Sequence, residues 1–144
     1  MRPVTCPRCG QPGQIELHDP VELTLGTVAV LLERRPLLTC RSGHQLVPAA
    51  AHEAAATAIA TAVPRSRLRW PRRERCGVCD GRLTMPVRRT VRPVSVESGE
   101  LPVLTIHLDL PMTRCPDCGV DQVPARSHGD VDAIPTALFG AERG

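Results

Sequence analysis

The clearest pattern in the chain is an alternation of aliphatic and other residues between positions 103 and 110. Every second side chain there is a large aliphatic one, namely Leu104, Ile106, Leu108 and Leu110. A period of two is typical of a β-strand with one buried face. Upstream, Val94 and Val96 share a face, and Ser98-Gly99-Glu100 has the composition of a turn. Residues 94–110 are therefore predicted to form a β-hairpin, with Pro93 and Pro102 at edge positions or bulges.

A weaker copy of this pattern lies in the first half of the chain. Aliphatic residues alternate over residues 21–25 and again over residues 28–32, and Gly26-Thr27 separates the two runs. These runs are predicted to form two further short strands joined by a turn.

Residues 48–63 are rich in alanine and end at Pro64, which predicts one helix. Its apolar face is small, and we expect Ile59 and Val63 to pack on the first half of the chain. After Val123 the chain is polar apart from residues 134–139, so a loose tail is expected there.

Six of the seven cysteines form three C-x-x-C pairs. The pairs are Cys6/Cys9, Cys76/Cys79 and Cys115/Cys118, and the seventh cysteine lies in Cys40-Arg-Ser-Gly-His44. A proline stands four residues before both Cys40 and Cys115, and the intervals from Cys9 to Cys40 and from Cys79 to Cys115 are 30 and 35 residues. Two copies of one module are the simplest interpretation of this repeat.

The second copy offers four thiolates, from Cys76, Cys79, Cys115 and Cys118. A C-x-x-C turn presents two thiolates on one tight knuckle, and two knuckles at the ends of a hairpin can clamp one tetrahedral ion. The alternative, reduced thiols in a core, fits three knuckle spacings poorly. A structural zinc ion is predicted, and a rubredoxin-like iron ion is the alternative at this four-cysteine site.

The first copy offers three thiolates and one imidazole, from Cys6, Cys9, Cys40 and His44. A second zinc ion held by three cysteines and a histidine is predicted. If His44 is only a loop residue, His18 and His52 are the substitutes, whereas His107 and His128 are interpreted as surface histidines. Each copy is too short to fold on its core alone, so we expect both ions to be structural.

Composition and missing motifs exclude several classes of protein. The chain has no lysine, which excludes a P-loop ATPase and a Schiff-base enzyme. It has no H-E-x-x-H, G-x-S-x-G or G-x-G-x-x-G motif, so we expect a protein that is not an enzyme and has no small-molecule substrate. No segment has the length and apolarity of a secretory signal or a membrane span, and the cysteine usage fits a reducing cytoplasm.

The second copy resembles the YgiT-type zinc-finger family, the zinc-binding domain of MqsA-type antitoxins. The resemblance rests on Cys76-x-x-Cys79, a spacer of hairpin length and Leu110-Pro111-Met-Thr-Arg-Cys115-Pro-Asp-Cys118-Gly119, about 45 residues in all. It implies that Cys76, Cys79, Cys115 and Cys118 hold zinc. The family's antitoxins bind DNA through a separate helix-turn-helix domain, which this sequence does not contain, so operator binding is not implied.

Positive charge is concentrated in residues 65–75, which contain six arginines and one glutamate. The candidate nucleic-acid-binding residues are Arg65, Arg67, Arg69, Trp70, Arg72, Arg73 and Arg75. Arginines in such a run can contact phosphates, and the alternative is a solvated linker. Against this, zinc ribbons present hairpin edges to which a partner strand can add, and Leu138 and Phe139 form an apolar island.

The sequence therefore predicts a small, metal-stabilised, β-rich protein of two tandem zinc-ribbon modules. The expected regions are residues 1–47 (first ribbon), 48–75 (helix and arginine-rich linker), 76–126 (second ribbon) and 127–144 (flexible tail). Its expected function is that of a protein-interaction adaptor or regulatory factor with a protein partner. The alternative is a nucleic-acid-binding protein that contacts phosphates through residues 65–75.

Overall fold

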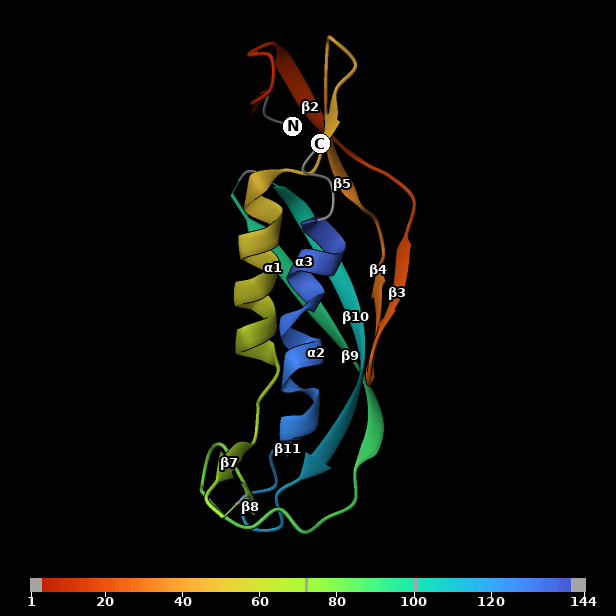
Figure 1. Ribbon diagram of the computed structural model, residues 1–144. Helices are drawn as coiled ribbons and strands as arrows, with labels where there is room; N and C mark the ends of the chain where they lie inside the picture. The colour runs from red at the N-terminus through yellow and green to blue at the C-terminus, as the bar shows by residue number, and fades with distance from the viewer. Residues whose placement is uncertain (1–3, 72, 100, 141–144) are drawn as a thin grey trace.

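The computed structural model describes residues 4–71, 73–99 and 101–140. Figure 1 shows an elongated molecule with a twisted sheet in the middle, helices on one face of that sheet, and a small cysteine-rich unit at each end. The predicted β-rich fold, with two small metal-stabilised modules and a helix between them, is confirmed.

The central sheet contains both predicted hairpins. Its strands are β3 (Val21–Leu25), β4 (Val28–Leu32), β9 (Arg88–Ser98) and β10 (Leu101–Arg114), in the order β3-β4-β10-β9. Strands β4 and β10 pair antiparallel, with Val30 opposite Leu108 and Leu32 opposite Ile106. The two halves of the chain therefore share one sheet.

The sheet is symmetric in its strand order, because each half contributes one hairpin and the second strands of the two hairpins, β4 and β10, are neighbours. The repeat seen in the cysteines thus extends to the topology. In each half, a helical segment also follows the last cysteine-rich turn. The strand β11 (Asp121–Gln122) pairs with the far end of β10, where Thr113 lies opposite Gln122.

Alternation along the strands decides which face is buried. The inward side chains Val28, Leu32, Ile106, Leu108 and Leu110 are all fully buried. Three helical segments cover this face, and the opposite face remains open to solvent (Figure 1). One continuous hydrophobic core therefore lies between the sheet and the helices.

The predicted alanine-rich helix is α1 (Ala49–Ala62). Its buried stripe consists of Ala51, Ala55 and Ile59, whose small side chains allow a close approach. The helix packs mainly on β9 and on α3 (Ile134–Phe139), both from the second half of the chain, and not chiefly on the first half as expected. Because both halves of the chain contribute strands to one sheet, β9 of the second half lies next to α1, which follows the first half.

Residues 125–139 are not the loose tail expected from the sequence. They form a short 3-10 helix, η1 (Ala125–Ser127), followed by α2 (His128–Asp132) and α3 (Ile134–Phe139). Ile134, Leu138 and Phe139 are buried, because a four-residue spacing places Ile134 and Leu138 on one helical face. Residues 141–144 of the expected tail lie outside the described residues.

The α2 helix is tied to the turn of the first hairpin. Both the backbone N–H and the hydroxyl of Thr27 donate to a carboxylate oxygen of Asp130, at 2.9 and 2.7 Å. These bonds to the ionised form lower the pKa of Asp130.

The end of the molecule that contains the N-terminal cysteines has its own sheet. Its strands are β1 (Val4–Thr5), β2 (Pro12–Leu17), β5 (Pro36–Cys40) and β6 (Gln45–Leu46), in the order β1-β2-β5-β6. The strands on which the first set of cysteines lies are therefore separate from the central sheet.

The arginine-rich segment is mostly exposed to solvent, as the linker interpretation expected, but it has a regular structure of its own. Strands β7 (Arg67–Arg69) and β8 (Arg73–Arg75) form a two-stranded hairpin, and we call residues 67–75 the arginine hairpin. Arg72 lies outside the described residues. Val123 anchors the segment before the hairpin, since its carbonyl accepts from the N–H of Ser66 at 3.1 Å. Among the described residues, no helix has the length and apolarity needed to cross a lipid bilayer.

Candidate metal centres

Four cysteines meet at the end of the molecule that carries the arginine hairpin. We call Cys76, Cys79, Cys115 and Cys118 the second metal cluster, and their Sγ atoms all lie within 4.8 Å of one another. The Sγ atoms of Cys76 and Cys118 are 3.6 Å apart, and those of Cys79 and Cys115 are 3.5 Å apart. A tetrahedral ion with metal–sulfur bonds of about 2.3 Å requires sulfur atoms about 3.8 Å apart. The cluster is therefore close to the geometry that such an ion needs.

Each knuckle is closed by the backbone. The N–H of Asp80 donates to the carbonyl of Cys76 at 3.0 Å, and that of Gly119 donates to the carbonyl of Cys115 at 2.9 Å. Both residues after the knuckle have positive φ, 63° at Asp80 and 78° at Gly119. In the Asp80-Gly81 turn the left-handed residue is thus the aspartate, which tolerates this conformation better than most side chains.

Gly81 lies where the two knuckles approach each other. A Cβ atom at this position would lie 2.3 Å from a carboxylate oxygen of Asp117 and 3.2 Å from the Sγ of Cys79. A larger residue here would have to displace the exposed Asp117 side chain and press on the Sγ of Cys79.

A buried glutamine supports the second metal cluster and is absent from the sequence-based site. Gln122 is fully buried, donates from Nε2 to the Sγ of Cys76 at 3.2 Å, and accepts at Oε1 from the N–H of Gly77 at 2.8 Å. A glutamine four residues after Cys118 carries no recognisable signal in one sequence. Groups that donate to a ligand atom in this way hold the ligand in place and tune its basicity.

These donors change the acidity of Cys76. Desolvation by burial works to raise its pKa, but the N–H groups of Cys79 and Val78 and the amide of Gln122 outweigh it and lower the pKa to about 6. The cluster therefore favours a thiolate at Cys76 near neutral pH, which is the form that binds metal.

The opposite end of the molecule brings together the four residues of the first repeat. We call Cys6, Cys9, Cys40 and His44 the first metal cluster, whose ligand atoms also lie within 4.8 Å of one another. The Sγ atoms of Cys9 and Cys40 are 3.7 Å apart, and the Nδ1 of His44 lies 3.5 Å from the Sγ of Cys40. Sulfur and nitrogen ligands of one tetrahedral ion stand about 3.5 Å apart, so the imidazole faces the cluster through Nδ1.

The other histidines have different partners. His18 lies 3.6 Å from Glu16, and His52 lies 3.1 Å from the hydroxyl of Thr136. Neither substitute for His44 belongs to the cluster. His107 lies half-buried on its strand, 2.7 Å from Glu33, whereas His128 is not a free surface residue, since its Nε2 lies 3.0 Å from the carbonyl of Val123.

Backbone N–H donors also lower the pKa of one thiol in the first metal cluster. Desolvation works to raise the pKa of Cys40, but the N–H groups of His44 and Ser42, with the neighbouring thiols, outweigh it and lower the pKa to about 6. Each cluster thus contains one cysteine whose pKa is lowered, whereas the pKa of Cys9 in the first cluster and of Cys79 and Cys118 in the second is raised.

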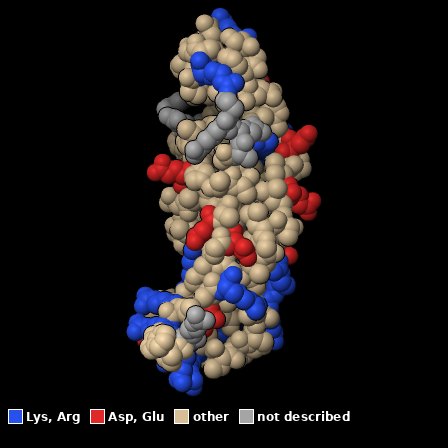
Figure 2. Space-filling view, viewed as in Figure 1, with Lys and Arg blue, Asp and Glu red and all other residues tan. Residues whose placement is uncertain are grey.

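The arginine hairpin lies beside the second metal cluster, and its two strands place positively charged side chains directly opposite each other. Arg67 pairs directly with Arg75, and Arg69 pairs with Arg73. Like charges directly opposite each other on adjacent strands are unfavourable. Figure 2 shows arginine side chains gathered at this end of the molecule and most acidic side chains over its middle.

One acidic residue partly offsets this charge. The Nε of Arg69 lies 2.9 Å from a carboxylate oxygen of Asp80, and Arg75 donates to the Asp80 carbonyl at 3.4 Å. Among the described residues, Arg67 and Arg73 have no acidic partner. Asp80 belongs to a cysteine knuckle, so the hairpin is held against the second metal cluster.

Arg65, the other described arginine of the predicted set, lies outside the hairpin and contacts α2. Arg65 forms an ion pair of 2.6 Å with Asp132 of α2. Trp70, in contrast, lies at the tip of the hairpin with 91% of its surface exposed.

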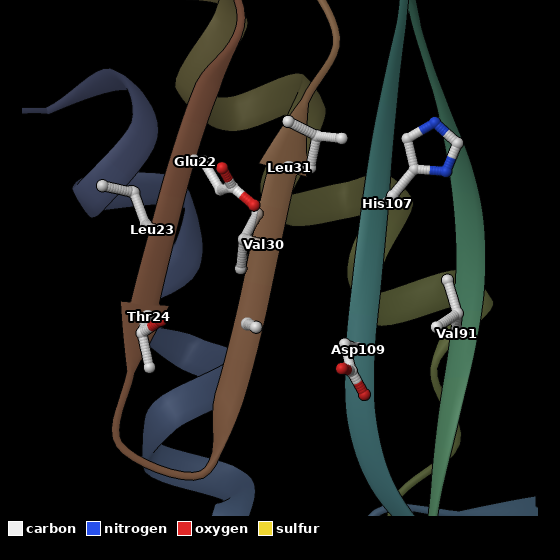
Figure 3. A pocket seen from close by; sticks show the side chains of 9 residues that line it. Glu22, Leu23, Thr24, Val30, Leu31, Val91, His107 and Asp109 are labelled. Atoms are coloured by element: carbon white, nitrogen blue, oxygen red, sulfur yellow. The ribbon is translucent and has the colours of Figure 1, made fainter.

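A shallow hollow lies on the uncovered face of the central sheet. It has a volume of about 340 Å³ and is lined by residues of all four strands, including Glu22, Leu31, Val91, His107 and Asp109 (Figure 3). Asp109 forms an ion pair of 3.0 Å with Arg89.

Comparison with known proteins identifies no relative: no family model, curated protein or solved structure matches this chain. The resemblance to the YgiT-type zinc-finger family therefore depends on the quoted cysteine motifs.

Proposed function

We propose that this protein is a non-enzymatic, zinc-stabilised nucleic-acid-binding protein that contacts phosphates through the arginine hairpin. The observation that carries the proposal is the pairing of Arg67 with Arg75 and of Arg69 with Arg73, with Asp80 as the acidic partner nearby. Guanidinium groups recognise phosphate oxygens in a bidentate way, and a bound phosphate would offset the repulsion between them.

The donor sets support zinc as the metal. Four protein ligands leave no open position at either cluster, as is usual for structural zinc. Elemental analysis by mass spectrometry should give two zinc ions per chain. A red protein with visible thiolate-to-iron absorption would instead assign iron to the second metal cluster.

One argument for an adaptor role loses force in the folded chain, because the apolar island is buried, with Leu138 only 2% and Phe139 only 5% exposed. The inner edges of both hairpins are occupied by the pairing of β4 with β10, whereas the outer edges, on β3 and β9, have no neighbouring strand among the described residues.

The test is fluorescence anisotropy with labelled duplex DNA and labelled single-stranded RNA over a salt series. The Arg67→Ala/Arg73→Ala variant should lose affinity for both probes, and its plot of log affinity against log salt should be flatter by up to about 2. The matched control is Arg8→Ala/Arg41→Ala, which removes two exposed arginines at the other end of the molecule. Equal effects of the two variants, or no binding at low salt, would reject the proposal.

A protein-interaction adaptor is the second candidate, favoured by the uncovered face of the central sheet. Val91 and Val103 on this face are 66% and 59% exposed, and Glu22 and Asp109 stand at the hollow. Such a surface suits a partner segment with apolar and basic side chains. The test is reconstitution of a purified binary complex, which Val91→Glu/Val103→Glu should abolish while leaving metal content unchanged.

A further inference from the structure

Most exposed large apolar side chains of the described residues lie in the stretch that contains the arginine hairpin and the first knuckle of the second metal cluster. Among the described residues, five of the seven exposed large hydrophobic side chains lie between positions 68 and 87. They are Leu68, Trp70, Val78, Met85 and Val87. The only tryptophan of the chain is the most exposed of them, at 91%. An aromatic ring left in water at the tip of a cationic hairpin indicates a binding surface.

We infer that the arginine hairpin binds single-stranded nucleic acid, with an unpaired base stacked on Trp70. This inference rests on the function proposed above and names the class of nucleic acid. Stacking on an aromatic ring accepts every base, since every base has a π-face.

The hairpin places the ring and the arginines within reach of neighbouring nucleotides. Trp70 follows β7 directly, and Arg67 stands three residues before it. At about 3.3 Å per residue, the two Cα atoms are about 10 Å apart along the strand. One nucleotide can therefore stack on the indole while a phosphate further along the strand contacts Arg67, or Arg73 across the hairpin.

The stem of the hairpin is tied to the second metal cluster. Arg69, the residue before Trp70, is paired with Asp80, which follows Cys79 directly, and Leu83 donates its N–H to the carbonyl of Glu74 at 3.3 Å. The base of the hairpin is thus held by the fold, while the indole at its tip is 91% exposed and open to a ligand.

A single strand suits this surface better than a duplex. In a duplex both faces of each base are covered by neighbours, so the indole can stack only by wedging between base pairs, which costs the stacking energy of the step that it opens. An unpaired base offers its face without that cost. The duplex gains only the phosphate contacts, whereas the single strand gains the phosphate contacts and the ring.

A lipid surface is less compatible with the hairpin. Alternation places Leu68 opposite Glu74, on the face away from the four arginines. The cationic and aliphatic side chains of the hairpin therefore point in opposite directions and do not present one plane to a membrane.

The chain provides its own probe for this inference. It contains one tryptophan and no tyrosine, so its ultraviolet emission above 300 nm comes from Trp70 alone. Titration of the zinc-loaded protein with a twelve-nucleotide oligo(dT) should quench this emission strongly. A twelve-base-pair duplex of mixed sequence should bind more weakly and leave most of the emission intact.

Substitutions at Trp70 and at the arginines distinguish the contribution of base stacking to affinity from that of the phosphate contacts. Trp70→Leu should weaken oligo(dT) binding roughly tenfold or more in anisotropy, with little effect on the duplex, and Trp70→Phe should restore most of that affinity. Because Trp70 is exposed, neither substitution disturbs the core. Arg67→Ala/Arg73→Ala should weaken both probes, since it removes the phosphate contacts.

The outcomes are distinguishable from failure of the proposed function. Absence of binding to either probe would reject the function itself. Equal binding of the two probes, unchanged by Trp70→Leu, would leave nucleic-acid binding in place and overturn the single-strand inference. A blue-shifted Trp70 emission with phosphatidylglycerol vesicles, together with no response to oligo(dT), would overturn it in favour of an anionic membrane.

Discussion

The two ends of the molecule have the same cysteine knuckles in different surroundings. The first metal cluster lies on its own sheet, β1-β2-β5-β6, and includes His44. The second has four cysteines, a fully buried glutamine beside Cys76, and the arginine hairpin against its first knuckle. The same kind of knuckle therefore stands alone at one end, and at the other it carries the hairpin that we propose as a binding surface.

Charge makes the contrast stronger. With a divalent ion, three thiolates and one imidazole have a formal charge of −1, and four thiolates have a formal charge of −2. The more negative cluster is the one beside the arginines. Part of the arginine charge thus compensates the cluster, and Arg67 and Arg73, which have no acidic partner among the described residues, remain for an external anion.

The sharpest way to break the comparison is to remove one ligand at each end. Cys118→Ser should release the second ion and disorganise the arginine hairpin while the first cluster keeps its metal, because β1, β2, β5 and β6 form a separate sheet. Structural zinc contributes on the order of 10–16 kcal/mol in small peptides, so the local loss should be complete. Native mass spectrometry should show one ion per chain.

Cys9→Ser is the mirror variant and should release only the first ion. It should leave the proposed nucleic-acid affinity nearly unchanged, whereas Cys118→Ser should abolish it. Loss of both ions in either variant would mean that the two ends are not independent.

A substitution in the shared core should affect both ends together. Leu108 is fully buried on β10, opposite Val30 of β4. Leu108→Ala should lower the free energy of unfolding by about 2–5 kcal/mol, as in other buried leucine truncations. Urea denaturation followed by circular dichroism measures this. Val103→Ala, at an exposed position, is the control and should change the free energy of unfolding by less than about 0.5 kcal/mol.

The buried glutamine should matter at one end only. Gln122→Leu removes the amide that donates to Cys76, so the second cluster should bind metal about tenfold more weakly or worse. Competition with a chromophoric chelator measures the two affinities. Gln45→Leu, at an exposed position next to His44, should leave both affinities unchanged, and an equal effect of the two variants would contradict the role assigned to Gln122.

The smallest effect concerns pH. The pKa is lowered to about 6 at Cys40 and Cys76 but raised at Cys9, Cys79 and Cys118, so proton competition with the metal extends to all of these ligands only as the pH falls through about 6. Metal should therefore be retained at neutral pH and released in mild acid. In Gln122→Leu the pKa of Cys76 rises, so release from the second cluster should move to higher pH. A zinc-sensitive dye follows this, and an unshifted midpoint would contradict it.

Local patterns predicted most of the metal chemistry. Both clusters follow from spacing, because a C-x-x-C pair brings two ligands together within one turn. The alternation of residues 104–110 likewise predicted a strand with one buried face. It did not identify the neighbouring strand, since Val30 and Leu32 present the same apolar face to any partner.

The missed features depend on tertiary context. Ile134 and Leu138 have helical spacing, but a six-residue helix is stable only against the core that it covers. The arginine segment is polar at almost every position, so its strand pairing depends on the knuckle at Asp80. Gln122 acquires its role only when β11 pairs with the end of β10.

The length of strand β10 sets the distance that a molecule in contact with both ends of the protein must span. Its 14 residues span about 45 Å and run from Leu101, which lines a hollow together with Val4 and Leu46 of the first half, to the residue before Cys115. The strand therefore serves as a ruler between the two ends. Any molecule that binds both ends at once must be long enough to match that span. A shorter ligand can occupy only one end and gains no affinity from the other.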